Sequence, residues 1–415
     1  MIPRFEPTAS LGEILSFLAG CARPGTPEDS HVRELETRFA EMVGCAHAVF
    51  VPSGRMALHL ILHGLDLPAG AEVVLPAFTF FAVPAVVRHA GFVPVYADVD
   101  PETCVLTPDT VQAVLTERTR AVVPTHLFGR TCDMDGLAAV CASRDIALIE
   151  DCAQSCGAEW RGRRTGQIGR AASFTFGITK NFTTFSGGMA VTADDAAAAR
   201  IRAALTGFAP ASRRALLKQG LTALAMRAAA WRPAFNLTAA PALRAEAARG
   251  PDVLHRAFEE KAAPVDDAVM RRLRWRPVDV QGRAGLRQLA TLDAKNAARR
   301  ERGRALLRLL RERGCGGLPA PPPAGGDNIY MSFPIRRGDR FRFIAGLRRG
   351  GVDVAPGYMT DCAARPELNG APGRCPHSAE VDREIIHLPL YPGLSERDLA
   401  RIADAVARTD RALGA

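Results

Sequence analysis

The chain has 415 residues, 47% of them hydrophobic, and carries 53 Lys or Arg against 44 Asp or Glu, for a net charge of +9. The positive charge is spread along the chain, without zinc-finger spacing or an RNA-recognition motif, so we expect no nucleic-acid partner. Ten cysteines without a paired CxxC set indicate reduced thiols, a cytoplasmic protein and no metal site. No apolar run reaches the ~18 residues of a membrane span.

The first two hundred residues alternate short apolar runs with helical patterns. Strands are predicted at 46–51, 72–75, 93–97, 121–125, 146–149 and 173–176. Helical patterns lie between them, for example at 56–65 and 134–144. This alternation predicts an α/β fold with a mostly parallel sheet. Ligands in such sheets bind beyond the carboxyl ends of the strands.

Residues 207–282 are rich in Ala and Arg and contain several prolines, which predicts a helical connector with breaks. Within it, 216–243 is fairly apolar, with Arg227 and Arg232 set among the apolar residues. This stretch fits either an amphipathic helix at a membrane surface or a helix packed on its own domain or on a second subunit. A long charged helix is then predicted at 283–313, and a small α+β domain after it. The predicted division is therefore 1–206, 207–282 and 283–415.

Two side chains at predicted strand ends point to chemistry. Only four of the 53 basic residues are lysines, and one of them, Lys180, directly follows a buried-looking strand. A lysine can form a Schiff base with pyridoxal 5'-phosphate (PLP), which an arginine cannot, because its guanidinium stays protonated. Asp151 ends the apolar run 147–151 and offers a carboxylate of the kind that PLP needs at its pyridinium nitrogen. Each residue alone also fits an ordinary surface position.

Two further segments offer binding groups. At Ser53-Gly54-Arg55 a strand stops, a tight turn follows and a helix begins, so free backbone N–H groups face an anion such as a phosphate. An ordinary capped helix start fits the same residues. After the strand at 72–75, Phe80 and Phe81 offer aromatic faces that could stack on a planar ring or belong to the core.

The order and spacing of these segments resemble the DegT/DnrJ/StrS family of sugar aminotransferases, which are fold type I PLP enzymes. The similar segments include VPSGRMALHLIL at 51–62, ALIEDCAQSCGA at 147–158 and SFTFGITKN at 173–181. The resemblance covers most of the chain except about 208–269. It implies an α/β large domain with a mostly parallel, seven-stranded type of sheet and a smaller C-terminal α+β domain.

The resemblance also implies residue roles. Lys180 corresponds to the Schiff-base lysine and Asp151 to the partner of the pyridinium nitrogen. The other implied cofactor contacts are Gln154 near the phenolic oxygen, Phe80 on the ring, and Thr175, Gly54 and Arg55 at the phosphate.

Several positions depart from the family pattern. Arginine replaces the usual residues at Arg55, Arg170 and Arg274, and Ser186 stands in the glycine-rich segment after the lysine. Arg274 stands where the family has an Asn that reaches the partner subunit's cofactor, so Arg55 or Arg274 could supply phosphate donors. A His often found near the substrate in the small domain is replaced by Gly357.

The function implied is transfer of an amino group from an amino acid, by family habit L-glutamate, to a nucleotide-linked keto-sugar in polysaccharide or secondary-metabolite biosynthesis. A homodimer with shared active sites is expected. Three alternatives stay open: a PLP-dependent dehydration, which Lys180 disfavours; a PLP-binding regulatory or assembly protein without turnover; and a membrane-surface enzyme that acts on a lipid-linked sugar through 216–243.

Overall fold

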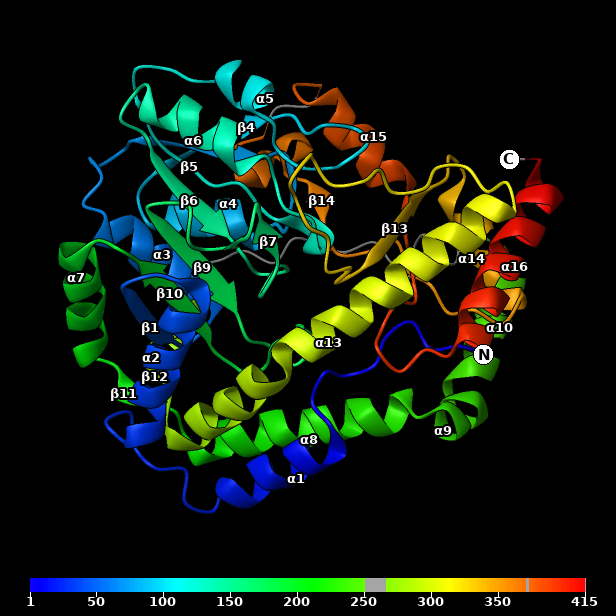
Figure 1. Ribbon diagram of the computed structural model, residues 1–415, viewed down its shortest axis with the longest axis horizontal. Helices are drawn as coiled ribbons and strands as arrows, with labels where there is room; N and C mark the ends of the chain where they lie inside the picture. Colours follow the sequence, from blue (N-terminus) through cyan, green and yellow to red (C-terminus); the bar gives the residue numbers. More distant parts are fainter. Residues whose placement is uncertain (251–265, 371–372, 415) are drawn as a thin grey trace.

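The centre of the molecule is a seven-stranded sheet between layers of helices, as seen in the computed structural model, which describes residues 1–250, 266–370 and 373–414 (Figure 1). The strands lie side by side in the order β1 (His47–Val51), β10 (Gly188–Thr192), β9 (Ala171–Thr175), β6 (Ala147–Asp151), β5 (Thr119–Val122), β2 (Glu72–Pro76) and β4 (Val93–Ala97). Only β10 runs antiparallel to its neighbours, β1 and β9. The predicted α/β fold with a mostly parallel seven-stranded sheet is confirmed.

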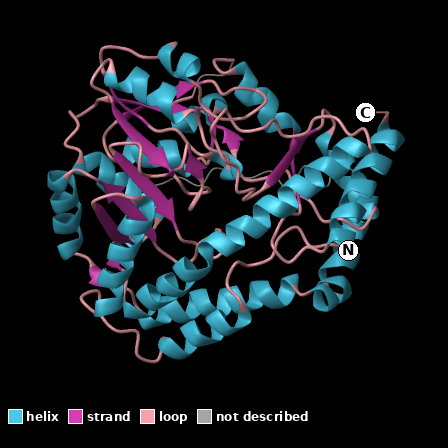
Figure 2. Cartoon of the chain, in the orientation of Figure 1, coloured by secondary structure: helices cyan, strands magenta, loops and turns pink. Residues whose placement is uncertain are grey.

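Side chains alternate between the two faces along each strand, and consecutive residues of these strands are apolar, so both faces of the sheet are apolar. In β1, Val49 and Val51 join the core beneath α3, whereas Ala48 and Phe50 join the core beneath α2. Both faces are therefore buried, as expected of a sheet with parallel crossovers. Figure 2 shows the strands enclosed by helices.

Helices α3, α4 and α7 pack on the first face, and α2 and part of α13 pack on the second, with α6 beside β5 and β6. The helices of the large domain are α1 (Leu11–Gly20), α2 (Ser30–Val43), α3 (Gly54–Gly64), α4 (Ala82–His89), α5 (Pro108–Gln112), α6 (Met134–Ala142) and α7 (Asp195–Thr206). The shorter strands around the sheet are β3 (Phe78–Thr79), β7 (Glu159–Trp160), β8 (Arg163–Arg164), β11 (Ala209–Pro210), β12 (Trp275–Arg276) and β14 (Thr360–Asp361).

The predicted helical connector contains four complete helices among its described residues, and the stretch 216–243, predicted to form one helix, is divided among the first three of them. Residues 251–265 of the connector lie outside the described part of the chain. The four helices are α8 (Arg213–Ala230), α9 (Arg232–Leu237), α10 (Ala239–Ala248) and α12 (Asp267–Arg272). The break falls at Trp231, which is extended and stands two residues before Pro233, and proline disfavours a continuing helix.

Helix α8 packs on α1 of the same chain, where Gly220 allows the Leu18 side chain to approach its backbone. Three large apolar side chains of the connector stay exposed, Leu221 at 57%, Trp231 at 65% and Leu237 at 81%. Among the described helices, none combines the length and apolar character that crossing a bilayer requires.

Helix α13 (Asp279–Glu312) is 34 residues long and crosses the molecule, drawn in yellow in Figure 1. It begins four residues before the predicted start, because Gln281 accepts a hydrogen bond from the Val278 backbone N–H and Asp279 places a carboxylate in the first turn. Its first half packs on α2 through Leu289 and Leu292, and its second half packs on α16 through Leu306.

The C-terminal part forms a second core around the end of α13. It contains the antiparallel strands β13 (Phe333–Arg336) and β15 (Ile385–Leu388) and the helices α14 (Arg340–Arg349), α15 (Pro376–Glu384) and α16 (Glu396–Leu413). The N-terminal segment joins it, because Ile2 bridges to Val352. The division at 1–206, 207–282 and 283–415 stays a prediction.

Candidate active site

One cavity of about 1430 Å³ opens at the carboxyl ends of the parallel strands. It is lined by residues that follow four strands: the β1 turn at Ser53-Gly54, Phe80 after β3, Asp151 at the end of β6, and the segment after β9 that carries Lys180. Of the predicted site residues, Gly54, Arg55, Phe80, Asp151, Gln154, Thr175 and Lys180 line this cavity together.

The turn at the start of α3 forms a tight cradle. Ser53 caps the helix, and its hydroxyl accepts a hydrogen bond from the Met56 backbone N–H at 3.2 Å. A Cβ on Gly54 would lie 1.8 Å from the Thr175 hydroxyl, and a Cβ on Gly188 would lie 2.7 Å from the Gly54 nitrogen. Glycine at these positions therefore lets Thr175 lie against the first backbone N–H groups of α3. The N-terminus of a helix, with its free N–H groups, is a favourable place for a phosphate.

Arg55 adds a cation beside this cradle. It occupies the first turn of α3 and makes no hydrogen bond or ion pair with any described residue. Desolvation lowers the pKa of its guanidinium. An anion at the cradle would therefore meet a positive side chain as well as backbone donors.

Asp151 presents a buried carboxylate to the cavity. It is 6% exposed, and it accepts hydrogen bonds from the Ala153 backbone N–H at 3.1 Å and from the Thr125 hydroxyl at 3.2 Å. Burial raises its pKa, although the Ala153 N–H, the nearby charge of Lys180 and the Thr125 hydroxyl act in the opposite direction. A cationic group placed in the cavity would stabilise the ionised form of this carboxylate.

Lys180 is held at the cavity wall with its amine available. Its Nζ lies 5.8 Å from the ring centre of Tyr358 and makes no hydrogen bond or ion pair with the described residues. The neighbouring Asn181 is buried, and its side-chain N–H donates to the carbonyl of Cys156 and to Asn296 of α13. The loop is therefore anchored while the amine at its tip stays free.

Phe80 and Gln154 complete the wall. The Phe80 ring packs against Phe81 with centroids 4.6 Å apart and meets Tyr358 edge-on at 6.3 Å. The Gln154 side-chain oxygen accepts a hydrogen bond from the Phe128 backbone N–H at 3.0 Å. This bond fixes the amide orientation, so the N–H₂ group, whose one partner among the described residues is the Met359 sulfur at 3.8 Å, is the end that can donate to a ligand.

Arg274 is the one predicted site residue that does not line the cavity of its own chain. Its guanidinium lies over the ring of Phe208, 5.3 Å from the ring centre. The adjacent Leu273 and Trp275 do line the cavity. A role for Arg274 at a cofactor would therefore require the site of a second subunit.

The other departures from the family pattern have identifiable contacts. Arg170 pairs with Asp194 at 2.9 Å on the surface. Ser186 lines the cavity, and its backbone and hydroxyl oxygens accept hydrogen bonds from Gln281 of α13 at 2.9 and 3.1 Å.

A histidine does lie beside Gly357, and the sequence reasoning missed it. The ring of His387, on β15, lines the cavity, and a Cβ on Gly357 would lie 2.4 Å from its Nε2. Its Nδ1 is hydrogen-bonded to the Ser332 hydroxyl, and its ring meets Phe128 edge-on. Burial lowers its pKa to about 4, which leaves a neutral imidazole at neutral pH. The sequence signal was a polar residue in the apolar run 385–390.

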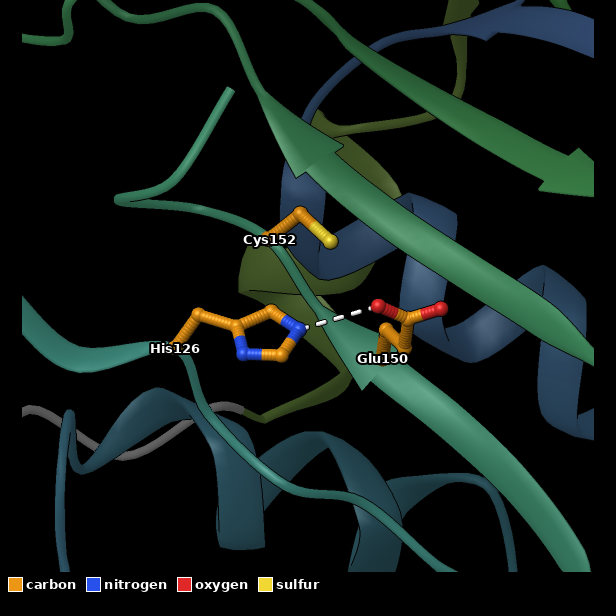
Figure 3. Close-up of side chains that lie close together, drawn as sticks. All are labelled: His126, Glu150 and Cys152. Carbon is orange, nitrogen blue, oxygen red and sulfur yellow. Dashed lines mark hydrogen bonds and ion pairs between the residues drawn. The ribbon is translucent and has the colours of Figure 1, made fainter. Parts of the chain in front are cut away.

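His126, Glu150 and Cys152 lie close together, and the last two flank Asp151 in the sequence (Figure 3). Glu150 is saturated, because it accepts from His126 Nε2 at 2.9 Å and from the backbone N–H groups of Gly166, Ile168 and Gly169. The His126 Nδ1 accepts from the Cys132 N–H. Burial acts to raise the pKa of Glu150, but these donors outweigh it and lower the pKa. The cluster thus supports the strand that carries Asp151 and offers no free ligand set to a metal.

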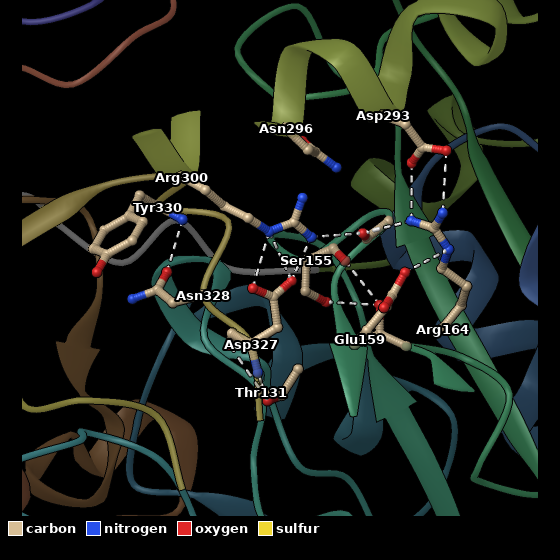
Figure 4. Close-up of polar contacts among 12 residues, drawn as sticks. Thr131, Ser155, Glu159, Arg164, Asp293, Asn296, Arg300, Asp327, Asn328 and Tyr330 are labelled. Atoms are coloured by element: carbon tan, nitrogen blue, oxygen red, sulfur yellow. Dashed lines mark hydrogen bonds and ion pairs between the residues drawn. The ribbon is translucent and has the colours of Figure 1, made fainter. Parts of the chain in front are cut away.

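A polar network joins the loop after Asp151 to α13 and to the small domain (Figure 4). Arg164 pairs with Asp293 of α13 at 2.9 Å, and Arg300 of α13 pairs with Asp327. Asn296 donates to the carbonyl of Cys156 at 3.0 Å. These contacts fix the cavity wall against the helix that carries both cores.

Comparison with known proteins gives the same picture. The model of the DegT/DnrJ/EryC1/StrS aminotransferase family matches residues 25–227 and 273–407. A GDP-perosamine synthase from Caulobacter vibrioides is 40% identical over 169 residues, 41% of this chain and 46% of that protein. A UDP-N-acetyl-3-dehydro-alpha-D-glucosamine 3-aminotransferase from Acidithiobacillus ferrooxidans is 29% identical and covers 98% of this chain and 94% of its own.

Solved structures have the same fold. The aminotransferase TlmJ from Streptoalloteichus hindustanus superposes with a TM-score of 0.77 at 26% identity and covers 100% of both chains. The resemblance found in the sequence is confirmed by these matches. The perosamine synthase match spans less than half of that protein's length.

Proposed function

Because the chain belongs to the DegT/DnrJ/EryC1/StrS aminotransferase family, we propose that it is a PLP-dependent enzyme that moves an amino group from L-glutamate to a nucleotide-linked keto-sugar. The observation that carries this proposal is one cavity that holds the free amine of Lys180, the buried carboxylate of Asp151 and the cradle at Gly54. We expect it to act in the cytoplasm as a homodimer.

The cavity residues fit the cofactor. The N–H groups at Gly54, the Thr175 hydroxyl and Arg55 suit the phosphate, and the pocket left by the absent Cβ of Gly54 keeps these donors together. Asp151 suits a ring nitrogen that carries a proton, because its buried charge lacks a direct cationic partner among the described residues. When bound, PLP supplies an electron sink for charge that develops on the substrate carbon.

The chain's own residues then have separate tasks. Lys180 would anchor the cofactor and afterwards act as general base and acid at the substrate carbon, because its amine is free and stands on an anchored loop. Phe80 would cover one face of the ring, and Gln154 would donate to its phenolic oxygen. We propose that Arg274 acts at the partner subunit's site, since it lies outside its own cavity.

The visible absorbance spectrum tests this proposal. Wild type with PLP should show a band that L-glutamate bleaches, Lys180→Ala should lack it, and Lys218→Ala, at another lysine of the same cavity, should keep it. A band that ignores every amino donor would favour the regulatory protein without turnover. Absence of any band that depends on Lys180 would refute the assignment.

Steady-state kinetics tests the order in which products leave and the acceptor binds, and it also tests which acceptors are used. An enzyme that releases its first product before the acceptor binds gives parallel lines in double-reciprocal plots, whereas intersecting lines would contradict this order. We expect nucleotide-linked keto-sugars to be turned over in preference to the free sugars.

The lipid-linked alternative keeps one observation in its favour, the exposed Trp231 and Leu237 of the connector. Liposome flotation of wild type and of a Trp231→Ser/Leu237→Ser variant decides it. Equal behaviour of the two proteins would remove this alternative.

A further inference from the structure

Arg299 is a buried arginine without a partner. Four arginines among the described residues are less than 9% exposed, Arg130, Arg299, Arg337 and Arg348. The other three are hydrogen-bonded: Arg130 to backbone carbonyls, Arg337 to Asp410 and Arg348 to Glu246. Arg299, which is 4% exposed, makes no hydrogen bond or ion pair with any described residue.

The position of Arg299 on α13 explains why its guanidinium has no hydrogen-bond partner among the described residues. Arg299 lies on the buried face of the helix, between Asn296 and Gly303. The next residue, Arg300, points elsewhere and pairs with Asp327. Glu6, whose charge partly offsets the burial of Arg299, pairs with Arg227 at 3.4 Å. The one acid whose charge acts on Arg299 is thus already paired with another arginine.

The Arg299 side chain forms part of the wall of the cavity that also contains Lys180. The wall of the same cavity also includes the apolar residues Phe5, Met331 and Leu390. Burial lowers the pKa of Arg299 to about 10, so the guanidinium is still protonated at neutral pH. A buried and unpaired charge destabilises the empty protein, and an anion entering the cavity would relieve that cost.

We propose that Arg299 is an oxyanion subsite of the active-site cavity, which binds the carboxylate of the amino donor or a phosphate of the acceptor. The planar guanidinium can hold either group through two parallel hydrogen bonds, and a lysine cannot reproduce that geometry. This inference rests on the proposed function for the names of its ligands. The subsite itself rests only on the burial and isolation of Arg299.

Direct binding tests the subsite without turnover. Glutarate, an unreactive dicarboxylate, and inorganic phosphate are titrated calorimetrically into the PLP-loaded protein, whose cofactor-phosphate cradle is already filled. Arg299→Met should bind one of these two ligands about tenfold or more weakly than wild type does. The affinity of Arg299→Lys should lie between those of wild type and Arg299→Met. The control is Arg308→Met on the same helix, where the side chain is 70% exposed.

The ligand that is weakened identifies the source of the oxyanion. Loss of glutarate binding assigns Arg299 to the donor, and loss of phosphate binding assigns it to the acceptor. Unchanged binding of both ligands by Arg299→Met would overturn the proposal. If wild type transfers no amino group but still needs Arg299 to bind glutarate, the proposed function fails and the subsite stands.

Thermal unfolding supplies a readout that a structural arginine would not give. Removing an unpaired buried charge should raise the unfolding temperature of the ligand-free Arg299→Met protein above that of wild type, and it should abolish the increase that glutarate or phosphate gives. A lower unfolding temperature with the ligand effect intact would mean that Arg299 is structural, and would contradict the proposal.

Discussion

At the scale of single residues, the absence of a side chain at Gly54 decides how close Thr175 comes to the first turn of α3. A methyl group there would lie 1.8 Å from the Thr175 hydroxyl, so the Thr175 side chain must rotate away, or β9 and the helix start must move apart. The donors proposed for the cofactor phosphate would then separate.

We therefore expect Gly54→Ala to bind PLP at least about tenfold more weakly, the loss that follows when one charge-assisted hydrogen bond is broken. Fluorescence titration of the apoprotein measures it. Gly12→Ala is the control, because a Cβ on Gly12 meets nothing within 4 Å and an alanine suits its helix better. Equal affinity of the two variants would mean that the cradle does not hold the phosphate.

His387 makes the stability of the protein depend on pH. Its folded-state pKa of about 4 lies below the ordinary value of 6.5, so between these values the unfolded chain binds a proton that the folded protein does not. The stabilisation is complete above pH ~6.5 and is lost as the pH falls toward 4. His387→Gln, which can still bond to Ser332, should reduce the fall in unfolding free energy between pH 7 and 4.5 by about 1–2 kcal/mol. Denaturant titrations at both pH values measure this fall. An equal fall in unfolding free energy in wild type and His387→Gln would contradict the prediction.

At the scale of elements, the site depends on how the β9 loop is tied to α13. Asn296 is fully buried, donates to the Cys156 carbonyl and accepts from Asn181, the neighbour of Lys180. Its loss leaves the loop with fewer contacts, although the Asn181 bond to Cys156 remains.

Asn296→Ala should lower the unfolding free energy by about 1–3 kcal/mol, because buried polar groups lose their partners. Asp293→Ala, almost one turn earlier, breaks only an exposed pair with Arg164 and should cost less than about 1 kcal/mol. Urea unfolding of both variants measures the difference. A larger loss in Asp293→Ala would mean that the surface network, and not the buried amide, holds the loop.

The elements also show what sequence reasoning can reach. The apolar runs predicted six of the seven central strands within a few residues, and the Lys180 and Asp151 segments were recognised from their position at strand ends. β10 was missed, because Gly188–Thr192 has few β-branched residues and begins at the second glycine of the pair Gly187-Gly188. His387 and Arg299 were missed for another reason. Which polar residue of an element faces a cavity depends on partners that are distant in sequence.

At the scale of the whole molecule, the role proposed for Arg274 requires a dimer with shared sites. If Arg274 serves the partner's cofactor, Lys180→Ala and Arg274→Asn proteins should each be impaired, and a mixture refolded together should regain about one quarter of the wild-type sites, because each mixed dimer has one intact site. Amino-group transfer measured after mixing tests this. No recovery in a preparation that sediments as a dimer would place Arg274 outside the partner's site.

Helix α13 contributes side chains to both hydrophobic cores, Leu292 to one and Leu306 to the other. With 34 residues it spans about 51 Å as one continuous helix. Unfolding of either core would therefore also remove packing contacts of α13 from the other core. Differential scanning calorimetry should accordingly record a single endotherm, with a calorimetric enthalpy equal to the van't Hoff enthalpy, for a chain whose size would otherwise suggest two separate meltings.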